Sequence, residues 1–206
     1  YFRICFLDPF QGTVLANFAH DKLGAQTVFC LGQLGNDYDQ GLINYFKQAA
    51  EGLGMNVITA EFPENNSDFT SYLTTAKNEG ADVIFAPCSI SYAQLIVEQC
   101  AAQGIDVPLL AGDTWDSNVI LNAAQGKSSE IYVSTFYAEG GDKDFEAGIK
   151  KWINENPTAK ANNGNDDMVA AVTVMGYDAY YTALEALKAA GSGGPPPRQA
   201  GPPTRN

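Results

Sequence analysis

The chain has 206 residues, of which 45% are hydrophobic, and its formal net charge is -12 at pH 7. This size supports one good-sized core or two small ones, and no apolar run reaches the ~20 residues that a membrane-spanning helix needs. Because the chain is acidic and has no basic stripe, we expect it to bind neither nucleic acid nor anionic lipid.

Apolar strands alternate with amphipathic helices along most of the chain. We expect strands at residues 2–7, 27–31, 56–60, 82–86, 109–111 and 131–136. We expect helices at residues 11–23, 37–53, 68–77 (with Ser67 as N-cap), 91–103 and 117–124. The strands are apolar throughout, which is typical of a parallel sheet covered on both faces. With right-handed crossovers, this predicts an α/β fold, a doubly wound, Rossmann-like parallel sheet sandwiched by helices.

The pattern changes after residue 136. Helices at residues 142–154 and 166–190 follow with no strand between them, and a loop rich in Asn, Ala and Gly separates them at 157–164. We therefore expect an α/β domain at 1–135, a helical part at 136–190 and a disordered Pro/Gly-rich tail at 191–206. Tyr1 starts inside an expected strand with no signal peptide before it, which indicates a fragment or a mature chain lacking its N-terminal part.

The cysteines and the single histidine give no sign of a metal centre. The four cysteines form no C-x-x-C pair, and Cys5 and Cys30 lie in apolar runs, where a buried small side chain is a better interpretation than a reactive thiol. Cys88 and Cys100 bracket one helix and lie too far apart along it to bridge. His20 has no clustered Cys or carboxylate partner. We expect no metal and no cofactor.

Chemically distinctive residues follow three of the expected strands. In an open α/β sheet, ligands bind outside the carboxyl ends of the strands. An acid beside an aromatic ring can bind a protonated amine, and hydroxyls with N–H groups at a helix N-terminus suit a carboxylate. The candidate ligand-binding residues are Tyr38 after strand 27–31, Ser89, Ser91 and Tyr92 after strand 82–86, and Asp113 with Trp115 after strand 109–111.

Each of these loops also has a plainer interpretation. Asp113 can be a helix N-cap beside a packing tryptophan, and Asp37 can cap the helix that it begins, with Asp39 in the same solvated helix start. Asp8 can pair with Arg3 or face the crevice. No G-x-G-x-x-G, P-loop or G-x-S-x-G motif occurs, so an enzyme that uses Asp113 or Asp8 as acid or base is the weaker alternative to a binding protein.

An ordered set of short segments resembles the branched-chain amino-acid-binding proteins of ABC transporters. The segments are FRICFLDPFQG (2–12), DKLGAQTV (21–28), NDYDQGL (36–42), SDFTSYL (67–73), GADVIFAP (80–87), GIDVPLLAGDTWDS (104–117) and GYDAYYTALEAL (176–187). The resemblance covers nearly all of residues 1–191. It implies a two-lobed periplasmic-binding-protein fold of type 1, with this chain supplying mostly the second lobe and residues 136–190 returning to a missing first lobe.

The resemblance also implies a function. It points to an extracytoplasmic solute-binding protein, periplasmic or a cell-surface lipoprotein, which is no enzyme and whose partners are an amino acid and a membrane ABC permease. The acid for the ligand ammonium falls on Asp113 and one aromatic position on Tyr38; a second aromatic position falls near Ser89, where Trp115 or Tyr92 can compensate. A ligand-sensing regulatory domain of the same fold is the alternative.

Two expectations follow from the missing lobe. Half a cleft cannot bury a ligand as a working pocket does, so we expect the chain alone to bind free amino acids weakly, with dissociation constants in the millimolar range or above. Apolar surface left bare by the missing half gives a route to a homo-oligomer.

Overall fold

The structure is a computed structural model that describes residues 3–191. Within these residues, five strands form one sheet in the order β2-β1-β3-β4-β5, and every neighbouring pair is parallel. This confirms the predicted doubly wound α/β class. The strands are β1 (Thr27–Gln33), β2 (Asn56–Phe62), β3 (Val83–Phe85), β4 (Leu109–Ala111) and β5 (Ile131–Val133).

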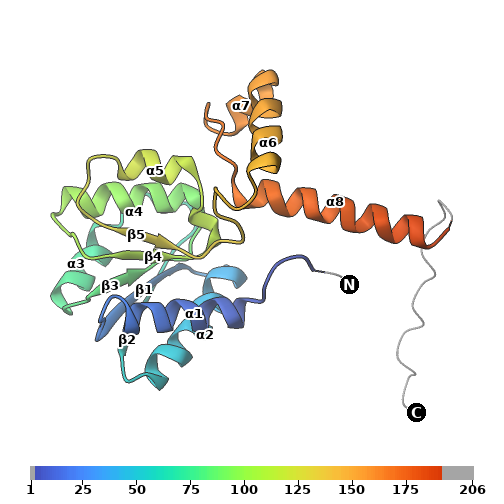
Figure 1. The fold of residues 1–206 in the computed structure, drawn as a ribbon. Coiled ribbons are helices and arrows are strands. Elements are labelled where there is room, and N and C mark those ends of the chain that lie inside the picture. The colour runs from blue at the N-terminus through green and yellow to red at the C-terminus, as the bar shows by residue number, and fades with distance from the viewer. Residues whose placement is uncertain (1–2, 192–206) are drawn as a thin grey trace, which may run out of the picture.

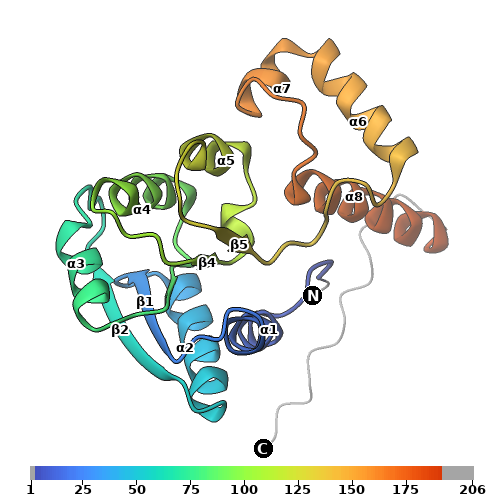
Figure 2. The same ribbon diagram turned by 60° about the vertical axis from the view of Figure 1, so that its left-hand side comes forward.

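Helices cover both faces of the sheet (Figures 1 and 2). One face carries α1 (Asp8–Asp21) and α2 (Asp37–Gly52). The other face carries α3 (Thr70–Asn78), α4 (Ile90–Ala102) and α5 (Asn118–Ala124). Three further helices lie beside the sheet beyond β5: α6 (Lys143–Glu155), α7 (Pro157–Asn162) and α8 (Ala171–Ala189).

Alternate residues of each strand pack into two separate cores. Val28 and Cys30 of β1 pack with α1 and α2, whereas Phe29 and Leu31 pack with the helices of the opposite face. All four side chains are fully buried. Because successive side chains of a strand point to opposite faces, burial on both faces requires the unbroken apolar runs seen in the sequence.

Several element predictions need correction. Residues 3–7 form no strand, because a strand needs a neighbour for its backbone groups and these residues have none within the described part of the chain. Residues 157–162, predicted as a loop, form α7, with Pro157 in its first turn, where a missing N–H costs nothing. Helix α3 starts at Thr70 with Phe69, not Ser67, at the N-cap. The predicted tail beyond residue 191 lies outside the described residues.

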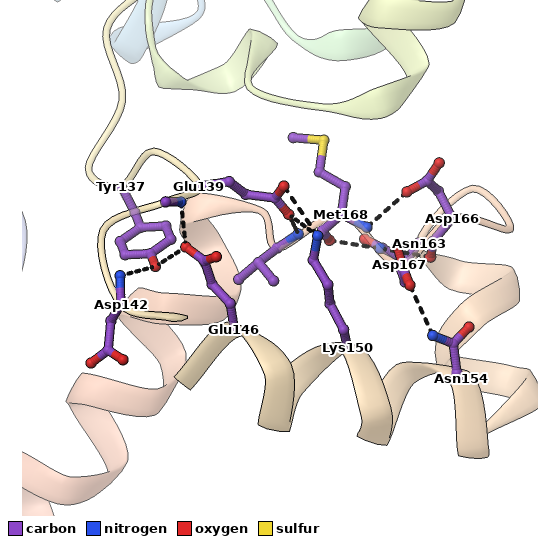
Figure 3. Close-up of polar contacts among 12 residues, drawn as sticks. Tyr137, Glu139, Asp142, Glu146, Lys150, Asn154, Asn163, Asp166, Asp167 and Met168 are labelled. Atoms are coloured by element: carbon purple, nitrogen blue, oxygen red, sulfur yellow. Dashed lines mark hydrogen bonds and ion pairs between the residues drawn. The ribbon is translucent and has the colours of Figure 1, made fainter. Parts of the chain in front are cut away.

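A polar network ties α6 to the segments before and after it (Figure 3). Glu139, in the segment between β5 and α6, accepts hydrogen bonds from the Val169 N–H (2.7 Å) and pairs with Lys150 Nζ on α6 (3.1 Å). Glu146 accepts from Tyr137 Oη (2.5 Å), and this hydrogen bond lowers the pKa of Glu146. These contacts fix where α6 leaves the sheet domain.

Helix α8 has little covering in this structure. Its large side chains Val172, Tyr177, Tyr180, Tyr181 and Leu187 are 42–65% exposed. Figures 1 and 2 show it projecting away from the sheet. Among the described residues, no helix is both long enough and apolar enough to cross a bilayer.

The packing of α1 against α2 is expected to depend on Gly12. A Cβ at this position would lie 2.8 Å from the Phe46 backbone N and 2.8 Å from Tyr45 Cβ, and backbone atoms cannot yield. We predict that Gly12→Ala lowers the free energy of unfolding by about 1–3 kcal/mol in denaturant titrations. Gly41→Ala on α2, where a Cβ meets nothing within 4 Å, is the matched control and should stabilise by about 0.4–1 kcal/mol. Equal effects of the two variants would contradict this assignment.

Candidate ligand-binding site

Asp113 follows β4 after one residue, Gly112, at the carboxyl edge of the sheet, where it begins the 3-10 helix Asp113–Trp115. Two neutral groups donate to the same carboxylate oxygen: Tyr38 Oη at 2.9 Å and Gln11 Nε2 at 2.8 Å from Oδ1. Both donors come from helices on one face of the sheet, α2 and α1. Two hydrogen bonds to one oxygen hold the carboxylate in a single orientation.

The second oxygen of Asp113 is open. Oδ2 accepts no hydrogen bond from the described residues, and Asp113 takes part in none of their ion pairs. The side chain is partly exposed. An oriented anion without an internal cation can bind a protonated nitrogen with a charge-assisted hydrogen bond.

Tyr38 reaches Asp113 from the first turn of α2. Asn36 Oδ1 accepts from the backbone N–H groups of Tyr38 (3.0 Å) and Asp39 (3.1 Å), so Asn36 caps this helix and the prediction of Asp37 as the cap was wrong. Burial raises the pKa of Tyr38, and the charge of Asp113 raises it further. The phenol therefore stays protonated and acts as a donor at neutral pH.

Gly112 allows the two donors to approach Asp113. A Cβ on Gly112 would lie 2.5 Å from Tyr38 Oη and 3.2 Å from Gln11 Nε2. The backbone of Gly112 is extended (φ -77°, ψ -172°), so the requirement for glycine here is one of space and not of conformation.

Trp115 does not flank this site. Its side chain is 1% exposed and packs in the core between the sheet and α4 and α5, and its Nε1 donates to the Cys88 carbonyl (3.0 Å). Thr114 Oγ1 donates to the same carbonyl (3.1 Å). The predicted role of Trp115 beside a ligand is therefore replaced by a structural one, because these two residues fasten the loop after β3 to the loop after β4.

Of the three predicted residues after β3, Ser89 and Ser91 lie on the surface and Tyr92 packs against β2. Ser89 and Ser91 are exposed at the start of α4, with their Oγ atoms 3.1 Å apart. Ser89 forms no side-chain cap, so the first N–H groups of α4 keep their usual need for a partner. Tyr92 packs its ring on Phe62 of β2 (4.8 Å between centroids) and accepts from the Asn65 N–H (3.0 Å), on the side of the sheet away from β4.

Two residues of the site, Gln11 and Ser134, were not predicted. Gln11 is 2% exposed, and its Nε2 donates to Ser134 Oγ (2.7 Å) as well as to Asp113. Gln11 and Asp113 are 102 positions apart in sequence, so local patterns could not join them. One feature of the sequence could have indicated Gln11. It is a polar residue four positions before Leu15 and eight before Ala19, so it shares their buried face of α1.

Other titratable groups that pack around the sheet are structural. Asp39, predicted to be solvated, is 1% exposed and accepts from the Gln33 N–H (2.8 Å), and burial raises its pKa. All four cysteines are free, and burial raises the pKa of the Cys100 thiol to about 12, which suppresses thiolate chemistry. The described residues contain no cluster of His, Cys, Asp or Glu that could hold a metal ion.

The chain belongs to the periplasmic binding protein family, whose model matches residues 2–201. The Leu/Ile/Val-binding protein homolog 1 of Brucella abortus (strain 2308) is 27% identical over 195 residues, which cover 94% of this chain and 50% of that protein. The chain therefore spans about half the length of the curated relatives that it matches.

Solved structures show the same fold. The leucine binding protein LivK from Thermotoga maritima superposes with a TM-score of 0.78 at 29% identity, covering 92% of this chain and 52% of that one. LivJ from Streptococcus pneumoniae, a branched-chain amino acid transporter substrate binding protein solved in complex with isoleucine, gives a TM-score of 0.71 at 25% identity, covering 88% and 50%.

The contact between Tyr38 and Asp113 predicts a coupled titration. In Asp113→Asn the negative charge is lost but burial remains, so the pKa of Tyr38 should fall while staying above the ordinary value of about 10. NMR of tyrosine labelled with ¹³C at Cζ measures this, with Tyr38→Phe identifying the signal. Because the folded-state pKa is raised, the stability from this proton is present below pH ~10 and is lost as the pH rises. An unchanged Tyr38 pKa in Asp113→Asn would contradict the contact.

Proposed function

We propose that this chain supplies one side of a cleft that binds an amino acid, with Asp113 holding the ligand ammonium. The single observation that carries the proposal is the half-occupied carboxylate: Tyr38 and Gln11 fill Oδ1, and Oδ2 is open at the carboxyl edge of the sheet. Ligands in this class of sheet bind at that edge. A primary ammonium needs one such acceptor and finds it already oriented.

The surrounding groups suit the other parts of an amino acid. Ser89 and Ser91 offer hydroxyls beside the N-terminus of α4, which favours a carboxylate or another polar end. A branched-chain ligand is supported by the leucine, isoleucine and valine named in the descriptions of three relatives. In this proposal Tyr38 orients Asp113 and borders the ligand, whereas Tyr92 packs on Phe62 of β2 and has no ligand contact.

The second side of the cleft belongs to the half of the relatives that this chain does not match. We propose that the exposed face of α8 meets this first lobe in the full-length protein, and that closure of the two lobes presents the ligand to an ABC permease outside the cytoplasm. The protein would bind its ligand without transforming it. In the isolated chain the same exposed aromatic face favours self-association.

An NMR titration of the 206-residue chain with L-leucine tests the proposal. We expect weak binding, with a dissociation constant in the millimolar range, because half a cleft leaves the ligand largely in water. Asp113→Asn should weaken it about tenfold or more, as a charge-assisted hydrogen bond is lost. The matched control is Asp106→Asn, an exposed acid before β4 at the opposite end of the sheet, which should leave the affinity unchanged.

The absence of shifts at Asp113 and Tyr38 up to saturating leucine would refute the proposed site. Equal loss of binding in Asp106→Asn would instead assign the effect to net charge.

A further inference from the structure

Strand β2 forms an open edge of the sheet. It pairs in parallel with β1 along all seven of its residues, and with no other strand of the described chain (Figure 2). The Asn56 N–H donates to the Gln26 carbonyl (2.8 Å), so the even-numbered residues of β2 direct their backbone groups toward β1. Val57, Thr59 and Glu61 direct theirs outward, and the described residues give these N–H and C=O groups no partner.

This edge has few of the features that usually block strand addition. Protein edge strands are often very short, bulged or covered, or they carry lysine or proline. The pairing of β2 with β1 has no bulge, and the strand carries one charge, Glu61, and no proline. Between α2 and β2 there is a hollow of about 330 Å³, which Thr59 and Glu61 line. The edge can therefore accept another extended strand.

The sequence of β2 is complementary to a second copy of itself. In an antiparallel pair centred on Thr59, Thr59 faces Thr59 of the second copy, and Val57 of each copy faces Glu61 of the other. These are the residues whose backbone groups point outward. Pro63, which has no N–H to donate, follows β2 and ends the ladder on both sides.

Lys47 of α2 lies where it can meet the charge of the second copy. Gln40 Nε2 donates to Glu61 Oε1 (3.0 Å), which places the start of α2 beside the end of β2. Lys47 is about 10 Å further along α2, and Val57 is about 13 Å back along β2. Because α2 runs opposite to β2, Lys47 lies between Thr59 and Val57, and it lines the same hollow as Thr59.

Charge favours this register over its neighbours. With Val57 opposite Glu61 of the second copy, that carboxylate approaches Lys47, whose side chain is 37% exposed and lies 3.7 Å from its own partner Glu51. A shift by two residues in one direction brings the carboxylate to Met55, beside Glu51. The opposite shift brings it to Thr59, diagonal to the carboxylate of the first copy. Both shifts place like charges together.

We propose that β2 pairs antiparallel with β2 of a second copy of this chain, with Lys47 of each copy paired to Glu61 of the other. The two-fold axis directs the carboxyl edges of the two sheets in opposite directions, so both Asp113 side chains stay open. The proposal goes beyond the proposed function and does not depend on it. One strand a side is far less than the 20–30 residues of a standard interface, so the dimer is weak.

Sedimentation equilibrium of the 206-residue chain, at concentrations up to about 1 mM, measures the dissociation constant of this dimer. Thr59→Pro removes an outward N–H from each copy and spares the pairing with β1, so it should weaken the dimer about tenfold or more. Thr59→Val keeps the N–H and the shape of the side chain. It is the matched control and should leave the dimer unchanged.

A charge swap tests the register and leaves the backbone intact. Glu61→Lys makes the chain less negative by two charges and so lowers the general repulsion between copies. It should nevertheless weaken the dimer about fivefold, because two lysines then meet. Lys47→Glu should weaken the dimer similarly, and the double variant Lys47→Glu/Glu61→Lys should restore the wild-type constant.

Tyr180→Ser, on the exposed face of α8, separates this interface from association through α8 and should leave the β2 dimer intact. Circular dichroism checks that each variant folds, and the charge swap decides the matter if Thr59→Pro does not. A wild-type chain that stays monomeric, a dimer that survives Thr59→Pro, or a double variant no tighter than the single ones would overturn the proposal. A dimer lost only in Tyr180→Ser would assign association to α8.

Discussion

The carboxylate of Asp113 is held on one oxygen by two neutral donors and left open on the other, and both donors come from helices that pack on one face of the sheet. A carboxylate at the end of a buried strand needs hydrogen bonds or an opposite charge to replace its lost hydration. With an arginine or lysine as the partner, the negative charge would be neutralised within the protein. Tyr38 and Gln11 instead satisfy the geometry without cancelling the charge, so the anion remains available to a ligand cation.

The fold makes this contact possible because a parallel sheet gathers its loops at one edge. Each donor side chain belongs to a helix that packs on the sheet through its apolar side chains. Phe46 and Leu42 anchor α2, and Leu15 anchors α1. Gly112 provides the space in which the donors meet Asp113. Trp115 and Thr114 fasten the neighbouring loop through the Cys88 carbonyl, so the serines at the start of α4 are held on the same rim.

Much of the fold could be predicted from the sequence, because the core imposes a local pattern. The run of β4, Leu109–Ala111, was predicted with its bounds, and the helix and strand alternation was correct from residue 27 onward except in α7. The site could be predicted only in part. Asp113 and Tyr38 stand next to strand ends and are visible locally, whereas Gln11 and Ser134 join them through contacts of 102 and 123 residues in separation. The prediction that Trp115 flanks a ligand was wrong for a related reason, because the side chain of an aromatic residue after a strand can point either outward or into the core.

We propose that Oδ2 of Asp113 is the acceptor for a ligand ammonium. A crystal structure of this chain soaked with L-leucine at a saturating concentration would show where that ammonium binds. We expect the leucine nitrogen at hydrogen-bond distance, about 2.7–2.9 Å, from Oδ2, with Tyr38 and Gln11 still bound to Oδ1. Leucine held elsewhere on the molecule, or with its carboxylate toward Asp113, would contradict it.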